Sequence, residues 1–226
     1  MTQLPFEQFP ALSAIGTCLH AFTQRIPNID VSHEKAEVLK RLSAAHDEIR
    51  HAIGMREWPL FTAQQVHGGK IAVVDSFSHG SVSREFPSCD GIITNQRGVS
   101  LGIYVADCCA VYIIDSKMPP IGLVHSGRKG TELGVVTNAI KQMGDCFGSD
   151  PSDLIVQFSP CIRPPHYEVD FAAEVARQCR ALGVKEIHDS PVCTACDLNR
   201  YYSYRAEKGK TGRMLALLGL KPTNTK

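Results

Sequence analysis

The sequence predicts an α+β fold in which layered, mixed β-sheets are flanked by helices. In some stretches apolar residues recur at three-to-four spacing, as in amphipathic helices, and in others they form short β-rich runs. These runs do not alternate strictly with the helical stretches, and several follow one another directly along the chain. Strict alternation would favour a doubly wound parallel sheet, so the observed order favours a layered α+β domain.

Four stretches show the apolar spacing of an amphipathic helix. In the first of them, Val38, Leu42 and Ile49 fall on one face. The four stretches are 35–53, 131–147, 168–182 and a segment near 197–207.

Short runs of apolar and β-branched residues predict the strands. The first run, at 70–74, follows a Gly68-Gly69 turn, and three more runs lie within 91–115. Later strands are expected at 121–125, at 154–158 and at 213–218.

The chain is expected to form one domain over residues 1–226. It contains no internal repeat, no low-complexity tract and no linker rich in glycine, proline or serine. Hydrophobic residues make up 43% of the chain and charged residues 21%, which supplies enough apolar surface for a core.

Charge and cysteine usage narrow the class of protein. The 24 basic and 23 acidic residues are scattered and leave a net charge of +1, without the basic excess of a nucleic-acid binder. No apolar run reaches the length of a membrane span, and the N-terminus lacks a signal-peptide pattern. Nine cysteines at irregular spacing favour reduced thiols over a disulfide framework. We therefore expect a cytoplasmic protein that binds neither nucleic acid nor membrane, with its oligomeric state left open.

Three residues that can bind a metal stand where sites usually form. His67 precedes a glycine turn, Cys108 lies between two apolar runs, and His125 ends an apolar strand. A cysteine and two histidines are good ligands for zinc or copper, and three protein ligands leave a fourth tetrahedral position open, as in catalytic sites. The spacing also fits a buried cysteine and two hydrogen-bonded histidines, because nine cysteines and nine histidines allow many such triples.

Six segments match one family pattern, in order and over nearly the whole chain. They are FTQR (22–25), QQVHGGKIAVV (64–74), CDGIITNQRGVSLGIYVADCCAVYIID (89–115), GLVHSGRKGT (122–131), SPCIRPPHYEV (159–169) and VCTACDLNRYYSYRAEKGKTGR (192–213). The sequence resembles the YfiH-type laccase-domain family, whose members are also called polyphenol oxidases or FAMIN-type purine nucleoside phosphorylases.

The resemblance implies both a fold and a metal site. The family's fold is a layered α+β sandwich of mixed sheets flanked by helices, in agreement with the prediction above. The family's metal ligands lie in its QVHG, ADC and H-x-G motifs, which places them here at His67, Cys108 and His125. The expected ion is zinc, with copper as the alternative because it outranks zinc on most nitrogen and sulfur sites.

The resemblance further implies an enzyme that uses these three residues in catalysis. A zinc-dependent purine nucleoside phosphorylase would cleave adenosine, inosine and related nucleosides with phosphate, so its partners are a nucleoside and phosphate. Deamination of adenosine is an expected side activity, because water on zinc can attack C6 of the base. The rival functions are a copper-dependent phenol oxidase, a metal-dependent amidase acting on cell-wall precursors, and a metal-binding protein that has lost catalysis.

Five charged residues are candidates for the substrate site. Arg25, Arg128, Lys129 and Arg205 are candidate phosphate contacts, and Asp90 is a carboxylate that could orient a histidine ligand. Arg128 and Lys129 lie near the expected start of a helix, where backbone N–H groups favour an anion. Each basic residue also fits a solvated surface charge, and Asp90 also fits a turn or cap carboxylate.

The sequence departs from the family pattern close to the expected ligands. Where the family reads H-A-G-W-R-G-T, this chain has Arg128 in place of Trp and Lys129 in place of Arg. Ala110 stands where the family usually has proline. We expect the metal to be retained and recognition of the aromatic base to be weakened, because an aromatic cover and a bidentate guanidinium are both lost.

The remaining cysteines and a tyrosine cluster carry weaker expectations. Cys193 and Cys196 form a CxxC pair without a second pair at matching spacing, so no structural zinc is expected there. Cys109 is expected in the core, because adjacent residues of an extended segment face opposite sides. One tyrosine of a three-member group is expected to line the pocket and two to pack inside; they are Tyr201, Tyr202 and Tyr204.

Overall fold

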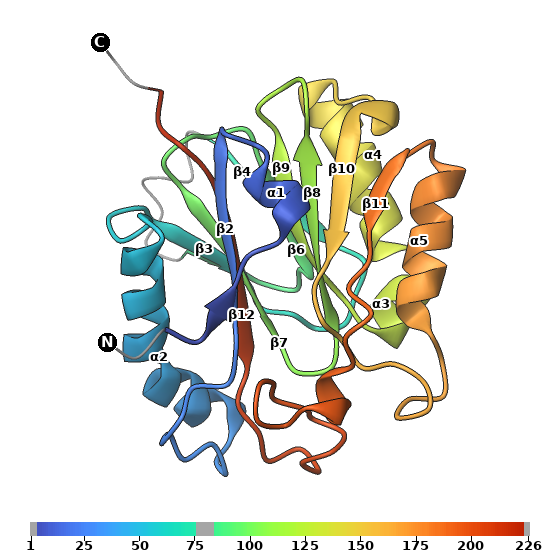
Figure 1. Ribbon diagram of the computed structural model, residues 1–226. Coiled ribbons are helices and arrows are strands. Elements are labelled where there is room, and N and C mark those ends of the chain that lie inside the picture. The colour runs from blue at the N-terminus through green and yellow to red at the C-terminus, as the bar shows by residue number, and fades with distance from the viewer. Residues whose placement is uncertain (1–3, 76–83, 224–226) are drawn as a thin grey trace.

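Two mixed sheets packed face to face form the centre of the molecule (Figure 1). This computed structural model describes residues 4–75 and 84–223, and within them each sheet has six strands. The first sheet has the order β1 (Phe6–Glu7), β2 (Cys18–Thr23), β12 (Met214–Leu220), β7 (Ser100–Val105), β3 (Leu60–Ala63) and β5 (Glu85–Phe86). The second has the order β11 (Glu186–His188), β10 (Leu154–Phe158), β8 (Cys109–Asp115), β9 (Ile121–Ser126), β6 (Gly91–Thr94) and β4 (Ile71–Val74).

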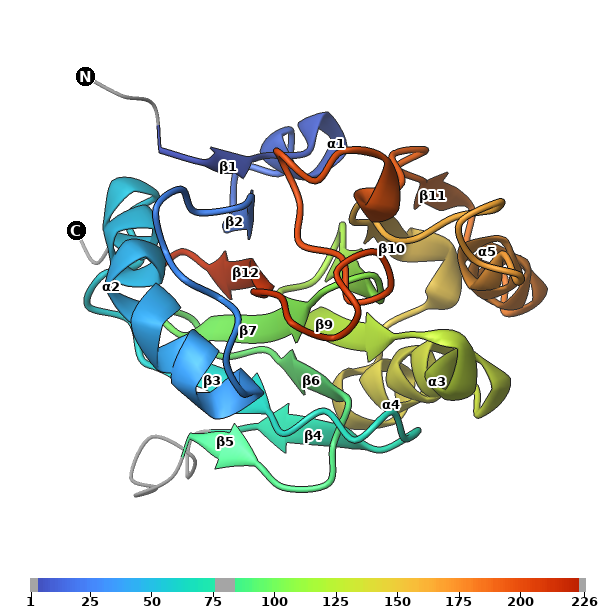
Figure 2. The same cartoon turned by 90° about the horizontal axis from the view of Figure 1, so that it is seen from below.

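Helices cover the two outer sides of this sandwich. The long helix α2 (Lys35–Ala52) lies on one side, and α4 (Val135–Phe147) and α5 (Phe171–Ala181) lie on the other, as Figures 1 and 2 both show. The short elements are α1 (Pro10–Ser13), α3 (Arg128–Glu132) and the 3₁₀ turns η2 (Pro151–Asp153) and η3 (Thr194–Cys196). The α+β layered fold predicted from the sequence is confirmed. Among the described residues, no helix has both the length and the apolar character needed to cross a membrane.

The alternation of side chains along β8 explains how this strand serves two cores. Tyr112, with Ala110 and Ile114, packs into the core shared with the first sheet. Cys109, with Val111 and Ile113, packs against α4 and α5. Because successive residues of a strand face opposite sides, an apolar run without polar interruption is what a strand covered on both faces requires.

The structure corrects two of the predicted helices. The stretch predicted as one helix at 131–147 is two helices, α3 and α4, because Gly134 between them has a left-handed backbone with φ 67°. The segment near 197–207 is a series of turns instead of a helix. There the carboxylate of Asp197 accepts hydrogen bonds from the backbone N–H groups of Asn199 and Arg200, which favours a turn over a helix.

Candidate metal centre

The pairing of β8 with β9 brings two of the three predicted ligands together. These strands are antiparallel, with Cys109 opposite Ser126 and Ala110 opposite His125. Cys108 immediately precedes β8 and His125 lies near the end of β9, so both side chains are at the same end of the second sheet. Residues 17 positions apart in sequence therefore become neighbours through strand register alone.

His67 reaches the same point from a tight turn beyond β3. Its backbone is in the left-handed region with φ 59°, which residues other than glycine adopt at a cost. The buried carboxylate of Asp90 holds this turn by accepting hydrogen bonds from the backbone N–H groups of Val66 (3.2 Å), His67 (2.8 Å) and Gly68 (2.7 Å). The strained conformation is thus fixed by a single fully buried side chain.

The donor atoms of His67, Cys108 and His125 converge. All lie within 4.8 Å of one another, and Cys108 Sγ is 3.9 Å from His67 Nε2. The two imidazole rings meet edge-on, with centroids 4.8 Å apart and planes at 76°. The structure therefore brings the three predicted residues together in a group that could hold a metal ion.

Asp90 also sets the orientation of His125. Its Oδ1 lies 2.9 Å from His125 Nδ1, which leaves Nε2 of that ring for a metal. A carboxylate behind a histidine ligand is the usual arrangement in metal sites, because it fixes the tautomer and the ring plane. Asp90 is completely buried, so it supports the ligands from behind and does not line the cavity.

The electrostatics of the group favour an ionised thiol. Burial opposes the charged form of Cys108, but the charge of His125 and hydrogen bonds from His125 and His67 outweigh it and lower the pKa of Cys108 to about 6. Burial likewise opposes protonation of His125, yet Cys108 and the hydrogen bond with Asp90 raise the pKa of His125 to about 9. A thiolate beside a histidine that a carboxylate orients is a donor set suited to a cation.

A glycine and a second strained residue make room for the thiol. A Cβ atom at Gly127 would lie 2.5 Å from Cys108 Sγ, so only glycine fits beside it. Asp107, just before Cys108, has φ 81°, and its carboxylate accepts hydrogen bonds from Thr194 Oγ1 and from the backbone N–H of Arg205, each at 2.7 Å. The donor set and its close-fitting surroundings fit a tetrahedral ion with one open position.

The three donors lie in a cavity of about 700 Å³. Aromatic side chains of Tyr167, Phe171 and Tyr204 form part of its wall. Basic side chains form another part, namely Lys35, Arg128, Arg205, Lys208 and Arg213. A pocket of this size that combines apolar walls with a few polar groups is typical of a small-molecule site.

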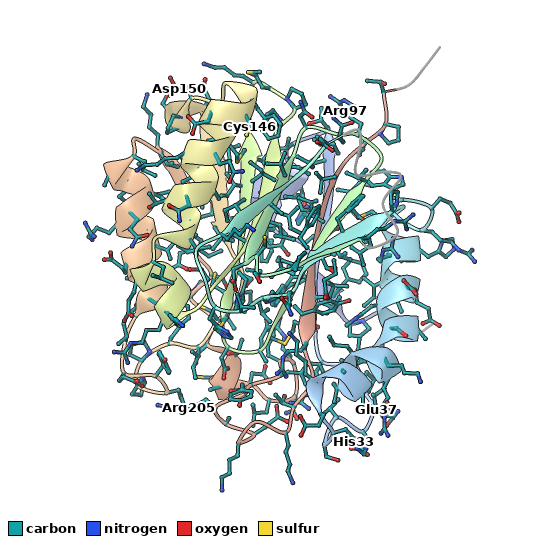
Figure 3. The ribbon with its side chains drawn as sticks, turned by 180° about the vertical axis from the view of Figure 1, so that it is seen from behind. His33, Glu37, Arg97, Cys146, Asp150 and Arg205 are labelled. Atoms are coloured by element: carbon teal, nitrogen blue, oxygen red, sulfur yellow. The ribbon has the colours of Figure 1, made fainter. Side chains whose placement is uncertain are left out.

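The structure places the predicted phosphate contacts in different surroundings. Arg128 and Arg205 line the cavity, and both pair with Glu168, at 3.3 Å and 2.9 Å. Lys129 is exposed and is not among the cavity residues. Arg205 lies at the end of the molecule opposite Cys146 (Figure 3).

Arg25 lies outside the cavity wall. Its guanidinium pairs with Glu207 at 2.7 Å, donates to the carbonyl of Tyr201 and lies over the ring of Tyr202. These contacts hold the segment before β12 against the loop after β2. The structure therefore gives Arg25 a role in packing and places it outside the cavity that contains the three donors.

Sequence reasoning identified one of the three cavity tyrosines and missed the other two. Tyr204 lines the cavity while Tyr201 and Tyr202 are fully buried, as predicted for that group. Tyr104 and Tyr167 were not predicted. The only available signal for Tyr167 was its place in the family segment at 159–169.

Two curated relatives are similar to this chain over most of its length. Purine nucleoside phosphorylase YlmD of Bacillus subtilis (strain 168) is 27% identical over 98% of this chain and 85% of its own length. Purine nucleoside phosphorylase ORF3 of Streptomyces griseus is 32% identical over 69% of this chain and 72% of its own.

Solved structures share the fold. The crystal structure of YlmD from Geobacillus stearothermophilus has a TM-score of 0.83 at 22% identity, covering 97% of this chain and all of that one. Bacillus licheniformis hypothetical protein YfiH also has a TM-score of 0.83, at 19% identity and 97% coverage of both chains. The family model described as multi-copper polyphenol oxidoreductase laccase matches residues 23–181 and 169–221. The chain therefore belongs to the multi-copper polyphenol oxidoreductase laccase family.

Proposed function

We propose that this protein is a zinc-dependent purine nucleoside phosphorylase that acts on adenosine, inosine and related nucleosides. The observation that carries the proposal is the position of the three donors, His67, Cys108 and His125, in a cavity whose walls are both aromatic and basic. Relatives that cover most of the chain are named purine nucleoside phosphorylases, which supports the same activity.

The cavity walls suit the two substrates of such a reaction. Tyr167, Phe171 and Tyr204 offer aromatic faces on which a purine base can stack. Arg205 and Arg213 offer positive charge to a phosphate, and Arg205 also lies over the Tyr167 ring at 5.3 Å. Base and phosphate would thus be held on adjoining parts of one wall.

In the proposed reaction a phosphate oxygen forms a bond to C1′ of the ribose as the bond from C1′ to the base nitrogen breaks. The departing base keeps the electron pair of that bond and takes up a proton. The basic side chains would orient the phosphate and offset its charge near the anomeric carbon, which lowers the barrier mainly by positioning. His67, Cys108 and His125 would hold zinc, which when bound supplies a Lewis acid at its open position.

Deamination of adenosine is proposed as a side activity of the same site.

The family's name favours a rival function, which is copper-dependent oxidation of phenols. Reduction of oxygen by a multi-copper site needs several clustered copper ions. Within residues 4–75 and 84–223, only one further group of three ligands accompanies the first, and it contains a single histidine.

The test is a parallel assay of zinc-loaded and copper-loaded protein with inosine, adenosine and a phenol. We expect zinc-loaded protein to release base only when phosphate is present, with some ammonia from adenosine. Cys108→Ala should abolish turnover and metal binding, and Cys109→Ala should retain both because its thiol lies in the helix-facing core. Phenol oxidation without release of base would contradict the proposal.

A further inference from the structure

A second group of metal-binding side chains lies outside the cavity wall. His166, Cys193 and Cys196 place their donor atoms within 4.8 Å of one another. His166 Nδ1 is 3.8 Å from Cys193 Sγ and 3.6 Å from Cys196 Sγ. The sequence prediction that this CxxC pair holds no zinc assumed that a second CxxC pair was needed, but the structure supplies a histidine from a distant loop.

These distances match those of a metal site. In a tetrahedral zinc site, bonds of about 2.3 Å to sulfur and 2.0–2.1 Å to nitrogen put the two donors about 3.6 Å apart. Two thiolates and an imidazole are the ligand types that zinc prefers, and CxxC spacing lets one short turn present both sulfurs. Among the described residues, the two sulfurs are the only hydrogen-bond partners of the His166 ring.

The backbone holds the ligands in place without an ion. Cys161 and Cys193 form a parallel bridge that joins the loop carrying His166 to the CxxC turn. The backbone N–H of Arg163 donates to Cys193 Sγ at 3.4 Å, which fixes the position of that sulfur. The 3₁₀ turn η3 then brings Cys196 round beside Cys193. The site is therefore built from two segments that are already fastened together.

We propose that His166, Cys193 and Cys196 bind a second divalent ion of the zinc type, with water in the fourth position. His166 and Cys196 are exposed, so an ion can enter from solvent. The position is distinct from the cavity, because none of the three residues lines it.

The ion would support the wall of the first site. Tyr167, next to His166, lines the cavity. Thr194, between the two cysteines, donates to the carboxylate of Asp107, which precedes Cys108. An ion that clamps the loop to the turn therefore fixes two parts of the cavity at once, and its loss should weaken substrate binding without removing the first metal.

The test uses cobalt as the probe in a Cys108→Ser background, where the first site lacks its thiolate. We expect one cobalt per chain in this variant to show thiolate-to-metal charge-transfer absorption. Adding Cys196→Ser should weaken this absorption, and adding His166→Ala should lower cobalt affinity. Matched controls are Cys146→Ser, at the far end of α4, and His51→Ala on α2, both exposed and both expected to change nothing.

Because the assay is made without the first thiolate and without nucleoside, its result does not depend on the proposed activity. Absence of cobalt–thiolate absorption in the Cys108→Ser protein would overturn the proposal. So would absorption that survives Cys196→Ser unchanged. A disulfide between Cys193 and Cys196 that forms in the presence of one equivalent of zinc would also overturn it.

Discussion

Asp90 joins two segments of the candidate metal centre by sharing one carboxylate between the ring of His125 and the backbone of the His67 turn. Oδ1 lies 2.9 Å from His125 Nδ1 and 2.8 Å from the His67 nitrogen. Burial alone would raise the pKa of Asp90, but the bonds from His125 and from the turn outweigh it and lower that pKa. The carboxylate therefore stays ionised and holds both ligands in one geometry.

Replacing Asp90 by Asn should weaken the metal site without unfolding it. The amide would set an N–H group against the backbone donors of the turn or against His125, so the ligands lose a fixed orientation. We expect metal affinity to fall by about 10–100-fold. Competition with a chelating dye measures this. Asp115→Asn is the control, because that buried carboxylate caps a turn at the far end of β8 and should leave affinity unchanged.

Adding one methyl group beside the thiol should be enough to lower the rate of the enzyme strongly. In Gly127→Ala the new Cβ would lie 2.5 Å from Cys108 Sγ, so the thiol or the turn after β9 must shift. A displacement near 1 Å costs about 100-fold in rate in well-ordered active sites. Steady-state kinetics should show this loss, whereas Gly16→Ala, with nothing within 4 Å of its new Cβ, should behave as wild type. Equal activity of the two variants would show that the thiol has more room than the structure gives it.

Arg128→Trp should lower the KM for nucleoside. Arg128 lines the cavity and pairs with Glu132 and Glu168, so an aromatic ring at this position could cover the base. A gain of ~0.5–1.5 kcal/mol for an aromatic pair corresponds to about a twofold to tenfold lower KM. The measurement uses inosine and adenosine at fixed phosphate. Arg128→Leu is the control, because it removes the ion pairs without adding an aromatic ring. An unchanged KM in Arg128→Trp would show that a ring at this position does not cover the base.

The free energy of unfolding should be lower at mildly acidic pH than at neutral pH. Burial lowers the pKa of both His20 and His46 from 6.5 to about 4, so the unfolded chain binds protons more tightly than the folded one. The free energy of unfolding therefore decreases as pH drops from 6.5 towards 4, by about 2 kcal/mol at pH 5 for each histidine.

Denaturant unfolding at pH 7.5 and pH 5 tests this dependence. His46 is buried, and its Nε2 has no hydrogen-bond partner among the described residues. Because it is one of the two histidines with a lowered pKa, His46→Leu should remove about half of the decrease in unfolding free energy between pH 7.5 and pH 5. His51→Ala, on an exposed position of the same helix, should leave it as in wild type. A His46→Leu protein with the full acid sensitivity would assign the effect to other groups.

The pattern of apolar residues predicted much of the fold. Where the prediction failed, the cause lies in a few local residues. The run at 154–158 coincides with β10, and the helix at 35–53 coincides with α2 within one residue. β2 was missed because His20 interrupts its apolar pattern, although that ring is buried and accepts a hydrogen bond from the Phe9 backbone. Periodicity cannot show that a buried polar group has found a partner.

The candidate site was predicted less evenly. The three candidate ligands came from family motifs, because spacing alone could not show that residues from a turn, a strand start and a strand end converge. Tyr167 was missed because it reaches the cavity from the loop before α5, and a loop leaves no periodic signal. Arg25 looked like an anion contact because charge is visible in sequence, whereas its partner Glu207 lies far along the chain.

The side-chain alternation of β8 has a consequence for how this chain tolerates change. Cys108 and Cys109 are adjacent in an extended segment, so their side chains point to opposite sides. Cys108 faces the cavity, and Cys109 faces the helices. A substitution at one position therefore perturbs one side of the strand. A single-residue insertion or deletion between Cys108 and Asp115 would instead turn every following side chain of β8 to the opposite side. Sequence length in this segment should be far more constrained than sequence identity.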